Sequence, residues 1–325
     1  MEIFIHEISE SFNTPSSFNK YYSNLNFAFF DIETTGLSRK NSKIILIGIL
    51  YICDGKIIVK QYFCNNRSEE KEMLLQFMKD IRDFHLLISY NGNAFDIPFI
   101  NERLKYNKIS DSINPYKSMD FLCLVRRNKD LLNLHNYKLK SVEELMGIHR
   151  NDTISGKDSV ALYNIYEETK DEKLLKVILL HNYDDLYFFS KTLKILDLIP
   201  EENLFLDFPY VINHEDYYKI YISKHIIKNS ALHIEGSILW NEENDYFFYD
   251  TLLDFKYEKY SNKFSLKILL EKGLSPNGEK CLYLPLDRIS NMDGNLVFKL
   301  DKNIQPNSLL YFYKNLLSTI LKNMP

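Results

Sequence analysis

Two carboxylates interrupt a hydrophobic segment near the start of the chain. The segment spans residues 27–37 and reads FAFFDIETTGL. Its aromatic and β-branched residues predict a buried strand, and alternation along a strand places Asp31 and Glu33 on the same face. Two unpaired anions there would cost several kcal/mol, so we expect a cation, and a hard divalent metal suits oxygen ligands. The alternative is a capping aspartate followed by a surface glutamate.

The composition is that of a globular protein. The chain has 325 residues, 45% of them hydrophobic, which is enough for one large domain or two ordinary ones. Its net charge of -4 means that any contact with nucleic acid must come from a local basic patch. The four cysteines lack the spacing of a disulfide framework or a zinc site, and no secretion signal or membrane-spanning segment is visible. We therefore expect a cytoplasmic protein with no membrane partner.

Strand and helix patterns alternate in the first part of the chain. Residues 1–25 predict a leader with weak structure. Two β-rich segments, 43–52 and 56–63, joined by Asp-Gly, predict a hairpin. An amphipathic helix over 69–83 and a short strand over 86–89 follow.

The segment SYNGNAFDIPFI, residues 89–100, forms a second motif. A polar turn leaves the short strand, and Pro98 lies where a helix begins, because a proline in the first turn loses no intrahelical hydrogen bond. Asp96 then lies at or near the N-cap. Capping alone is therefore a sufficient structural explanation of this aspartate.

Residues 117–121 predict a further strand, and residues 138–150 predict a short helix that opens with a capping box at Ser141 and ends at Gly147. This part of the chain is rich in cations. Solvated surface charge explains each cation singly, but together they are candidates for phosphate contacts. The candidates are Arg126, Arg127, Lys140 and Arg150.

A long helix is predicted over 171–198. The residues that recur along one side of this helix are apolar except for Asn182. At about 100° per residue, Asp185 lies at the edge of the buried face and His181 lies on the same side of the helix, whereas Tyr183 lies on the opposite flank. By itself such a His/Asp pair is often only a local hydrogen bond.

Taken in order, Asp31-x-Glu33, Asn91-x-x-x-Phe95-Asp96 and Asp185 resemble the DEDD superfamily of 3′–5′ exonucleases, which has a ribonuclease H-like fold. The same segments, together with residues 139–150 and 154–156, are similar to its bacterial YprB-like branch. The resemblance covers roughly residues 26 to 198. It implies an α/β domain over 26–200, with a mixed sheet flanked by helices.

The resemblance also implies a site and a reaction. Four carboxylates would hold two Mg²⁺ or Mn²⁺ ions for phosphodiester hydrolysis at a single-stranded 3′ end of DNA or RNA. These implied ligands are Asp31, Glu33, Asp96 and Asp185. Substrate contacts are implied at Thr34, Asn91 and Phe95, beside the four cations named above.

The last motif differs from the two best-known forms of the family. One has Tyr four residues before the final Asp and the other has His five residues before it, whereas here His181 precedes Asp185 by four. Because histidine titrates near neutrality, we prefer His181 to Tyr183 as the group that orients or deprotonates the attacking water. A structural histidine is the alternative.

Residues 201–325 predict an α+β domain rich in antiparallel strands, of unknown role and protein partner. Strands are predicted over 217–227, 231–234, 246–253, 264–270 and 281–284, with a hairpin turn at 275–278 and a helix over 307–322. In FKYEKY, residues 255–260, aromatic residues alternate with lysines. This pattern suits base stacking beside phosphate contacts, or simply exposed strand positions.

The sequence therefore predicts a metal-dependent 3′–5′ exonuclease. A non-catalytic nucleic-acid-binding or scaffold protein that keeps the fold is a second hypothesis, and the intact set of four acids argues against it. A nuclease of different polarity, or an endonuclease, is a third, because the same metal chemistry permits it.

Overall fold

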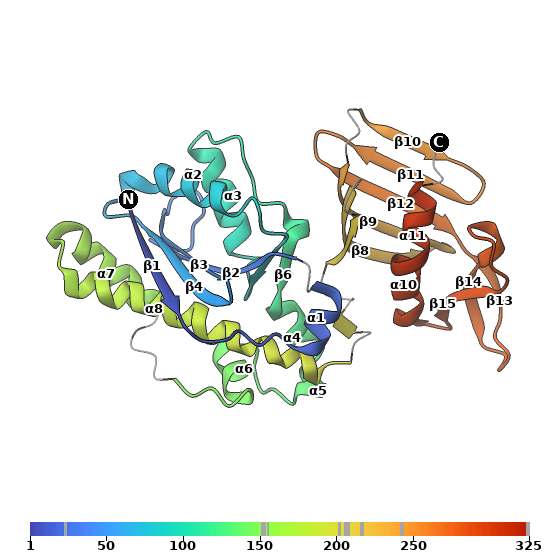
Figure 1. Cartoon of the computed structure of the whole chain (residues 1–325), viewed down its shortest axis with the longest axis horizontal. Coiled ribbons are helices and arrows are strands. Elements are labelled where there is room, and N and C mark those ends of the chain that lie inside the picture. Colours follow the sequence, from blue (N-terminus) through green and yellow to red (C-terminus); the bar gives the residue numbers. More distant parts are fainter. Residues whose placement is uncertain are drawn as a thin grey trace. The chain divides into compact units, whose positions relative to one another are not determined.

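The computed structural model describes residues 1–22, 25–150, 154, 156–200, 203–204, 209–214, 218–240 and 244–322. The chain divides into two compact units, Met1–Ile199 and Pro200–Pro325 (Figure 1). Among the described residues, no helix has both the length and the apolar character needed to cross a membrane. The predicted motif at 154–156 lies partly outside the described residues, because Ser155 is not among them.

A six-stranded mixed sheet forms the centre of the first unit. Its strand order is β1-β4-β3-β2-β5-β6; the strands β1 to β4 pair in antiparallel fashion, and β5 and β6 add parallel to β2. The bounds are β1 Glu2–Ile8, β2 Phe27–Thr34, β3 Ile44–Cys53, β4 Lys56–Phe63, β5 Leu86–Ser89 and β6 Ser118–Asp120. The predicted mixed sheet and its hairpin are confirmed.

Helices cover both faces of this sheet. The bounds are α1 Ser16–Tyr22, α2 Glu70–Asp80, α3 Asp96–Tyr106, α4 Phe121–Arg127, α5 Lys129–Leu132, α6 Leu139–Leu145, α7 Gly156–Thr169 and α8 Glu172–Lys191. Ile47 packs in one core with residues of α2 and α3, and its neighbour Leu46 packs in another with residues of α7 and α8. The two pairs of helices therefore lie on opposite faces, as Figure 1 shows.

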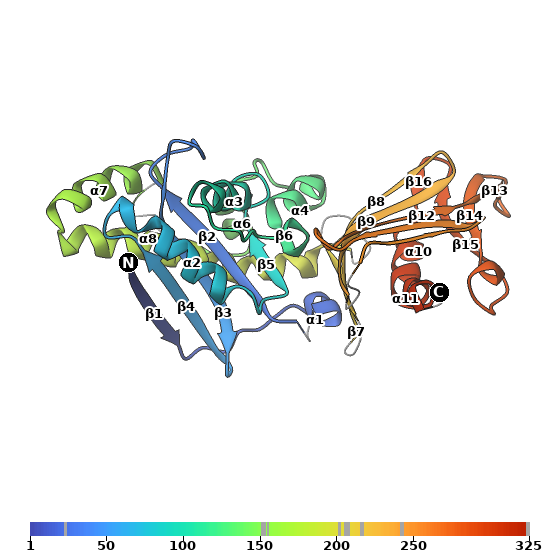
Figure 2. The same cartoon turned by 90° about the horizontal axis from the view of Figure 1, so that it is seen from above.

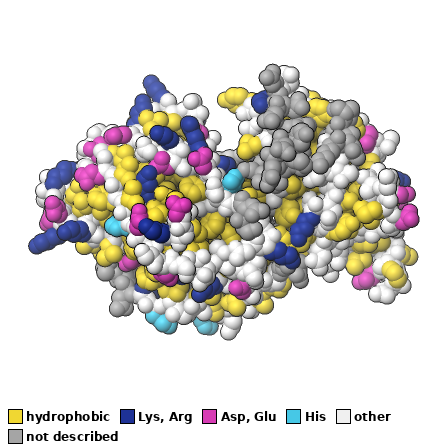
Figure 3. Space-filling view, in the orientation of Figure 1, with side chains coloured by type: hydrophobic (Ala, Val, Ile, Leu, Met, Phe, Trp, Pro, Cys, Tyr) yellow, Lys and Arg dark blue, Asp and Glu magenta, His cyan; other side chains and the backbone are white. Residues whose placement is uncertain are grey.

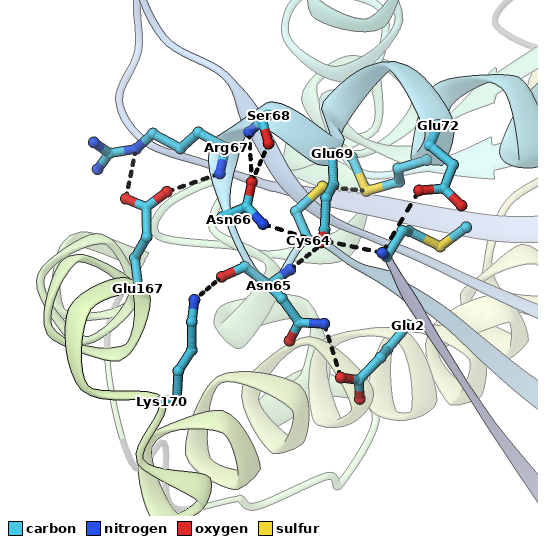
Figure 4. A network of polar contacts seen from close by, with 12 residues as sticks. Glu2, Cys64, Asn65, Asn66, Arg67, Ser68, Glu69, Glu72, Glu167 and Lys170 are labelled. Carbon is cyan, nitrogen blue, oxygen red and sulfur yellow. Dashed lines mark hydrogen bonds and ion pairs between the residues drawn. The ribbon is translucent and has the colours of Figure 1, made fainter.

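The predicted N-terminal leader is wrong. Residues Glu2–Ile8 pair with β4 along their whole length, from Glu2 opposite Phe63 to Ile8 opposite Ile57. Their β-branched and aromatic side chains suit a strand, and the neighbouring strand is what stabilises it. Polar contacts join β1 to the segment after β4, where the Asn65 amide donates to Glu2 Oε1 at 2.7 Å (Figure 4).

The predicted capping box of α6 is also wrong. The helix begins at Leu139, and Lys138 is its N-cap without a side-chain hydrogen bond. Asn136 Oδ1 accepts hydrogen bonds from Lys138 N and from Ser141 Oγ, both at 2.9 Å. This asparagine closes the turn before the helix, so the chain enters the helix two residues before Ser141. The predicted end of the helix is confirmed, since Gly147 follows it with φ 74°.

The second unit contains the predicted antiparallel strands. They form a six-stranded sheet of order β10-β11-β12-β9-β8-β7 and a four-stranded sheet of order β13-β14-β15-β16. The bounds are β7 Tyr210–His214, β8 Tyr218–Lys228, β9 Ala231–Trp240, β10 Tyr246–Tyr249, β11 Leu253–Glu258, β12 Lys263–Leu269, β13 Glu271–Leu274, β14 Lys280–Pro285, β15 Asn295–Leu300 and β16 Asn303–Ile304. The predicted strand over 246–253 is two strands, because Asp250 Oδ1 accepts from the backbone N–H groups of Leu252 and Leu253 and closes a turn.

A helical segment at the end of the chain packs on one face of the larger sheet. It comprises α10 Pro306–Tyr311, a π-helical turn over Phe312–Leu316 and α11 Leu317–Lys322. The ring of Tyr313 lies 5.5 Å from that of Tyr210 on β7. Phe255 and Tyr257 of β11 are 0% exposed, so both alternatives for these two rings, base stacking and exposed strand positions, are wrong. Alternation along β11 turns them toward the core of the unit.

The packing of α8 on β3 depends on Gly48. In the sheet, Gly48 lies directly opposite Asp31 of β2. A Cβ atom on Gly48 would lie 2.1 Å from Asn182 Oδ1 and 2.5 Å from Leu186 Cδ1, and both residues are fully buried in α8. The helix therefore rests on bare backbone, and this brings its polar residues to the strand that carries Asp31.

We expect Gly48→Ala to lower the free energy of unfolding by about 1–3 kcal/mol, because the added methyl group overpacks a closed interface. Gly156→Ala is the matched control, since an added Cβ there has no atom within 4 Å and alanine suits a helix. Urea unfolding followed by circular dichroism measures both. Equal midpoints for the two variants would contradict the packing described above.

Candidate metal centre

The strand β2 supplies the first two carboxylates of the candidate site. Asp31 and Glu33 occupy alternate positions near its end, and Glu33 is only 8% exposed. A bulge follows Glu33 and separates it from Thr34 in the pairing with β3. The hydroxyl of Thr34 donates to the carbonyl of Gly36 at 2.8 Å and shapes the turn that leaves the strand.

Asp96 lies at the start of α3 and is 5% exposed. Its Oδ1 accepts a hydrogen bond from the backbone N–H of Ile32 at 3.3 Å. Ile32 lies between Asp31 and Glu33, so this bond ties the beginning of α3 to the acidic end of β2. The N-cap position is held by Phe95 with no side-chain hydrogen bond, so helix capping does not account for Asp96.

The helix α8 adds a histidine and a further carboxylate. His181 Nε2 lies 3.6 Å from Glu33 Oε1 and 3.7 Å from Asp185 Oδ2. One potential ligand atom from each of these three residues lies within 4.8 Å of the other two. Tyr183 points elsewhere, with its ring 5.4 Å from His6 of β1. The predicted helix faces of His181 and Tyr183 are confirmed.

Hydrogen bonds between amide side chains connect Gln61 through Asn182 to the carboxylate of Asp31. Gln61 Nε2 of β4 donates to the Leu179 carbonyl at 2.8 Å and to Asn182 Oδ1 at 2.9 Å. Because Asn182 Oδ1 is occupied as an acceptor, its Nδ2 faces Asp31 and donates to Oδ2 at 3.0 Å. Gln61 and Asn182 are both 0% exposed. Neither residue is among the predicted site residues, although a single amide among the apolar residues on one side of a helix is a signal for such a buried bond.

Arg150 pairs with one of the predicted metal ligands. Its Nη2 lies 2.6 Å from Asp185 Oδ1, and its Nε donates to Glu143 Oε2 at 3.0 Å. The guanidinium carbon lies 5.6 Å from the ring centroid of Phe188. The acidic partners Asp185 and Glu143 outweigh the effect of burial and raise the pKa of Arg150. Arg150 is thus held inside the site and is not a solvated surface cation.

Asp120 supports the second motif and was missed from the sequence. Its carboxylate accepts from the backbone N–H groups of Asn91 at 2.8 Å, Asn93 at 3.0 Å and Leu122 at 3.0 Å. The first two bonds hold the turn before α3, in which Asn91 has a left-handed φ of 70°. The signal was present, because an aspartate between a strand and a helix is a typical N-cap.

The other predicted substrate contacts differ in their surroundings. Phe95 is half-buried with its ring 5.5 Å from Phe99, and it packs against the core. Arg126, Arg127 and Lys140 are exposed on α4 and α6. On the face of the first unit seen in Figure 3, Lys and Arg side chains are interspersed with Asp and Glu and form no single basic patch.

Burial and mutual repulsion resist ionisation of the acids. Burial, then the charges of Asp96, Glu33 and Asp185, hold the pKa of Asp31 well above its ordinary value, and the bond from Asn182 offsets part of this effect. Burial and the charge of Asp185 raise the pKa of Glu33 to about 8. Burial raises the pKa of Asp96 to about 7. Carboxylate oxygens suit a hard divalent cation, which would favour the ionised forms of these acids, and His181 adds a nitrogen to the group close enough to hold one.

A family model described as RNase_H superfamily matches residues 28–196. The chain belongs to the RNase H superfamily. This agrees with the mixed sheet and with the fold that the sequence motifs predict.

The chain is 29% identical over 170 residues to the uncharacterized protein YprB of Bacillus subtilis (strain 168), and the alignment covers 51% of this chain and 40% of YprB. It is 34% identical over 131 residues to the PolC-type DNA polymerase III of Ureaplasma parvum serovar 3, covering 29% of this chain and 9% of the polymerase. It is 34% identical over 123 residues to the DNA polymerase of Ostreid herpesvirus 1, and this alignment covers 36% of this chain and 6% of the polymerase. The matches thus span less than half the length of each relative. The predicted similarity to YprB is confirmed.

We expect the metal-free first unit to lose stability as the pH rises. The pKa of Glu33 is about 8 in the folded chain against an ordinary value of 4.5, so between these values the folded chain binds a proton that the unfolded chain releases. This stabilising contribution is complete below pH 4.5 and is lost as the pH passes about 8. Calorimetry in EDTA at a series of pH values should show Glu33→Gln with a flatter dependence than the wild type.

The control for this experiment is Glu168→Gln, which changes an exposed glutamate of α7. It should keep the wild-type dependence on pH. Parallel profiles for Glu33→Gln and the wild type would contradict the electrostatic account.

Proposed function

We propose that the first unit is a metal-dependent 3′–5′ exonuclease that hydrolyses phosphodiester bonds at nucleic-acid 3′ ends. The observation that carries this proposal is the convergence of carboxylates from β2, α3 and α8. His181 Nε2 of α8 lies 3.6 Å from Glu33 and 3.7 Å from Asp185. Burial and neighbouring acids raise the pKa values of Asp31, Glu33 and Asp96. Membership of the RNase H superfamily and the similarity to DNA polymerases support it.

The residues fit a two-metal site. Asp31, Glu33, Asp96 and Asp185 would hold two Mg²⁺ or Mn²⁺ ions, and such ions activate a water and stabilise a leaving oxygen. The chain itself fixes the geometry. Asn182 orients the carboxylate of Asp31, and the Ile32 N–H orients that of Asp96.

His181 is the proposed acceptor of the proton from the attacking water. Its Nε2 lies between the carboxylates of Glu33 and Asp185, which would stabilise the imidazolium that forms. Arg150, beside Asp185, and the exposed Arg126, Arg127 and Lys140 are the proposed phosphate contacts. Thr34, Asn91 and Phe95, which flank the carboxylates in sequence, are the proposed contacts with the terminal nucleotide.

Digestion of end-labelled oligonucleotides tests the function. With Mg²⁺ or Mn²⁺, a 5′-labelled single strand should give a ladder of products shortened from the 3′ end, and EDTA should abolish it. Digestion of DNA and RNA oligonucleotides of the same sequence, side by side, shows which nucleic acid is the better substrate. Asp31→Asn, which keeps the shape of the side chain, should give no ladder. Full cleavage by this variant, or shortening from the 5′ end, would refute the proposal.

The role of His181 has a separate test. We expect His181→Ala to lower single-turnover cleavage by roughly 10²–10⁴-fold at saturating metal, because it removes a positioned proton acceptor. Substrate binding in EDTA should be nearly unchanged. Tyr183→Phe, on the other flank of the same helix, should cleave at the wild-type rate. If the tyrosine variant is the slow one, the proton acceptor is not His181.

A further inference from the structure

The larger sheet of the second unit has one open face. Along β12, Phe264, Leu266 and Ile268 are buried, whereas Lys263 before them and Ser265 between Phe264 and Leu266 are exposed. The helical segment of α10 and α11 lies against the buried side, as Figures 1 and 2 both show. Along β10, β11 and β12 the side chains of the opposite side are exposed or half-buried, whereas Ser237 of β9, on the same side, is buried.

Two rows of side chains cross this open face from β8 to β10. The strand register aligns Ile226, His233, Lys267, Asp254 and Tyr249 in one row. It aligns Lys224, Glu235, Ser265, Lys256 and Phe247 in the other. Each row ends in an aromatic side chain on β10.

These two aromatic side chains are unusually open to solvent for their size. Phe247 is 49% exposed and Tyr249 is 63% exposed. Being two residues apart in one strand, they point to the same side with a spacing of about 6.8 Å. An extended single strand of nucleic acid can place successive unstacked bases at such a spacing, and aromatic side chains bind bases of any sequence through their faces.

Cations lie next to both rings. Lys256 Nζ lies 5.8 Å from the ring centroid of Phe247. A hollow of about 260 Å³ adjoins Tyr249, and His233, Lys256 and Lys267 are among its lining residues. A base stacked on Tyr249 would therefore bring its phosphate within reach of lysine side chains.

The open face has a positive balance of charge, although the whole chain carries -4. Among the described side chains, the same alternation that defines the two rows places five lysines on this face against four acids, a balance of +1. The lysines are Lys224, Lys228, Lys256, Lys263 and Lys267, and the acids are Glu235, Asp245, Asp254 and Glu258.

Ion pairs do not block these lysines from a ligand. The pairs are Lys224–Glu235 at 3.4 Å, Lys256–Glu258 at 2.6 Å and Lys267–Asp254 at 2.8 Å. In each pair both side chains are at least 39% exposed, and exposed pairs of this kind contribute little. A phosphate can therefore recruit the lysines at small cost.

We propose that this face binds single-stranded nucleic acid, with successive bases stacked on Phe247 and Tyr249 and the backbone along Lys256 and Lys267. The proposal deepens the proposed function, because the bound strand would be substrate of the nuclease. Binding itself belongs to the second unit and needs no metal.

Fluorescence anisotropy of the full chain in EDTA, with labelled oligo-dT and oligo-rU, measures this binding without cleavage. We expect Phe247→Ala/Tyr249→Ala to weaken binding by about tenfold or more, since each stacked base is lost. Lys256→Ala/Lys267→Ala should weaken it and reduce the dependence of affinity on salt. Phe247→Trp/Tyr249→Trp, which keeps an aromatic ring at both positions, should bind the oligonucleotides with the affinity of the wild type. Thermal unfolding should match the wild type, because the altered side chains are exposed.

Tyr260→Ala is the matched control, since Tyr260 is fully exposed in the turn between β11 and β12 and outside the two rows. It should bind as the wild type does. Unchanged affinity in the Phe247→Ala/Tyr249→Ala variant overturns the proposal, and so does absence of any oligonucleotide binding by the wild type. Failure of the proposed nuclease function is distinct, because it would leave binding in EDTA intact and remove only the metal-dependent products.

Discussion

The hydrogen bond from Asn182 to Asp31 joins α8 to the central strand, and the candidate site depends on it. The bond forms because Gly48 lets the helix approach the sheet closely and because Gln61 fixes the orientation of the Asn182 amide. The same approach carries His181 and Asp185 to Glu33. A short set of packing and hydrogen-bond constraints thus assembles acids that are distant in sequence.

The first unit contains carboxylates whose charge is matched by a buried cation, and others that lie among further acids. Glu70 is paired with buried Arg103 through contacts of 2.8 and 2.7 Å, and it also accepts from the Ile44 N–H at 2.9 Å. Its charge is matched within the protein. Asp31 and Glu33 instead lie among other acids, whose charges raise their pKa values. The Asn182 amide donates to Asp31, and Arg150 pairs with the neighbouring Asp185. A cluster of acids of this kind can hold a cation from solution.

The sequence predicted local features well because local patterns determine them. Asp31, Glu33 and Asp96 lie beside strand ends and turns that each have a short signature, and the face of His181 follows from helix geometry. The bond between Gln61 and Asn182 joins residues 121 positions apart, so no local pattern contains it. The same holds for β1, whose stability depends on pairing with β4.

The wrong prediction for Phe255 and Tyr257 has a similar cause. Alternation indicates two faces of a strand, but which face is covered depends on where the chain's last helices pack. Once that is known, Phe247 and Tyr249 of the neighbouring strand are found as exposed aromatic residues on the open side. The residue types suggested the same ligand class that we propose for this face, but for different rings.

The central claim is that the carboxylates around Asp31 form a site for a divalent cation. Isothermal titration of the metal-free chain with Mn²⁺ tests it directly, comparing the wild type with Asp31→Asn, whose amide oxygen can still accept from Asn182. The account predicts saturable binding by the wild type and a loss in the variant greater than the roughly 10–100-fold that removal of an outer partner costs. Identical isotherms for the two proteins would contradict it.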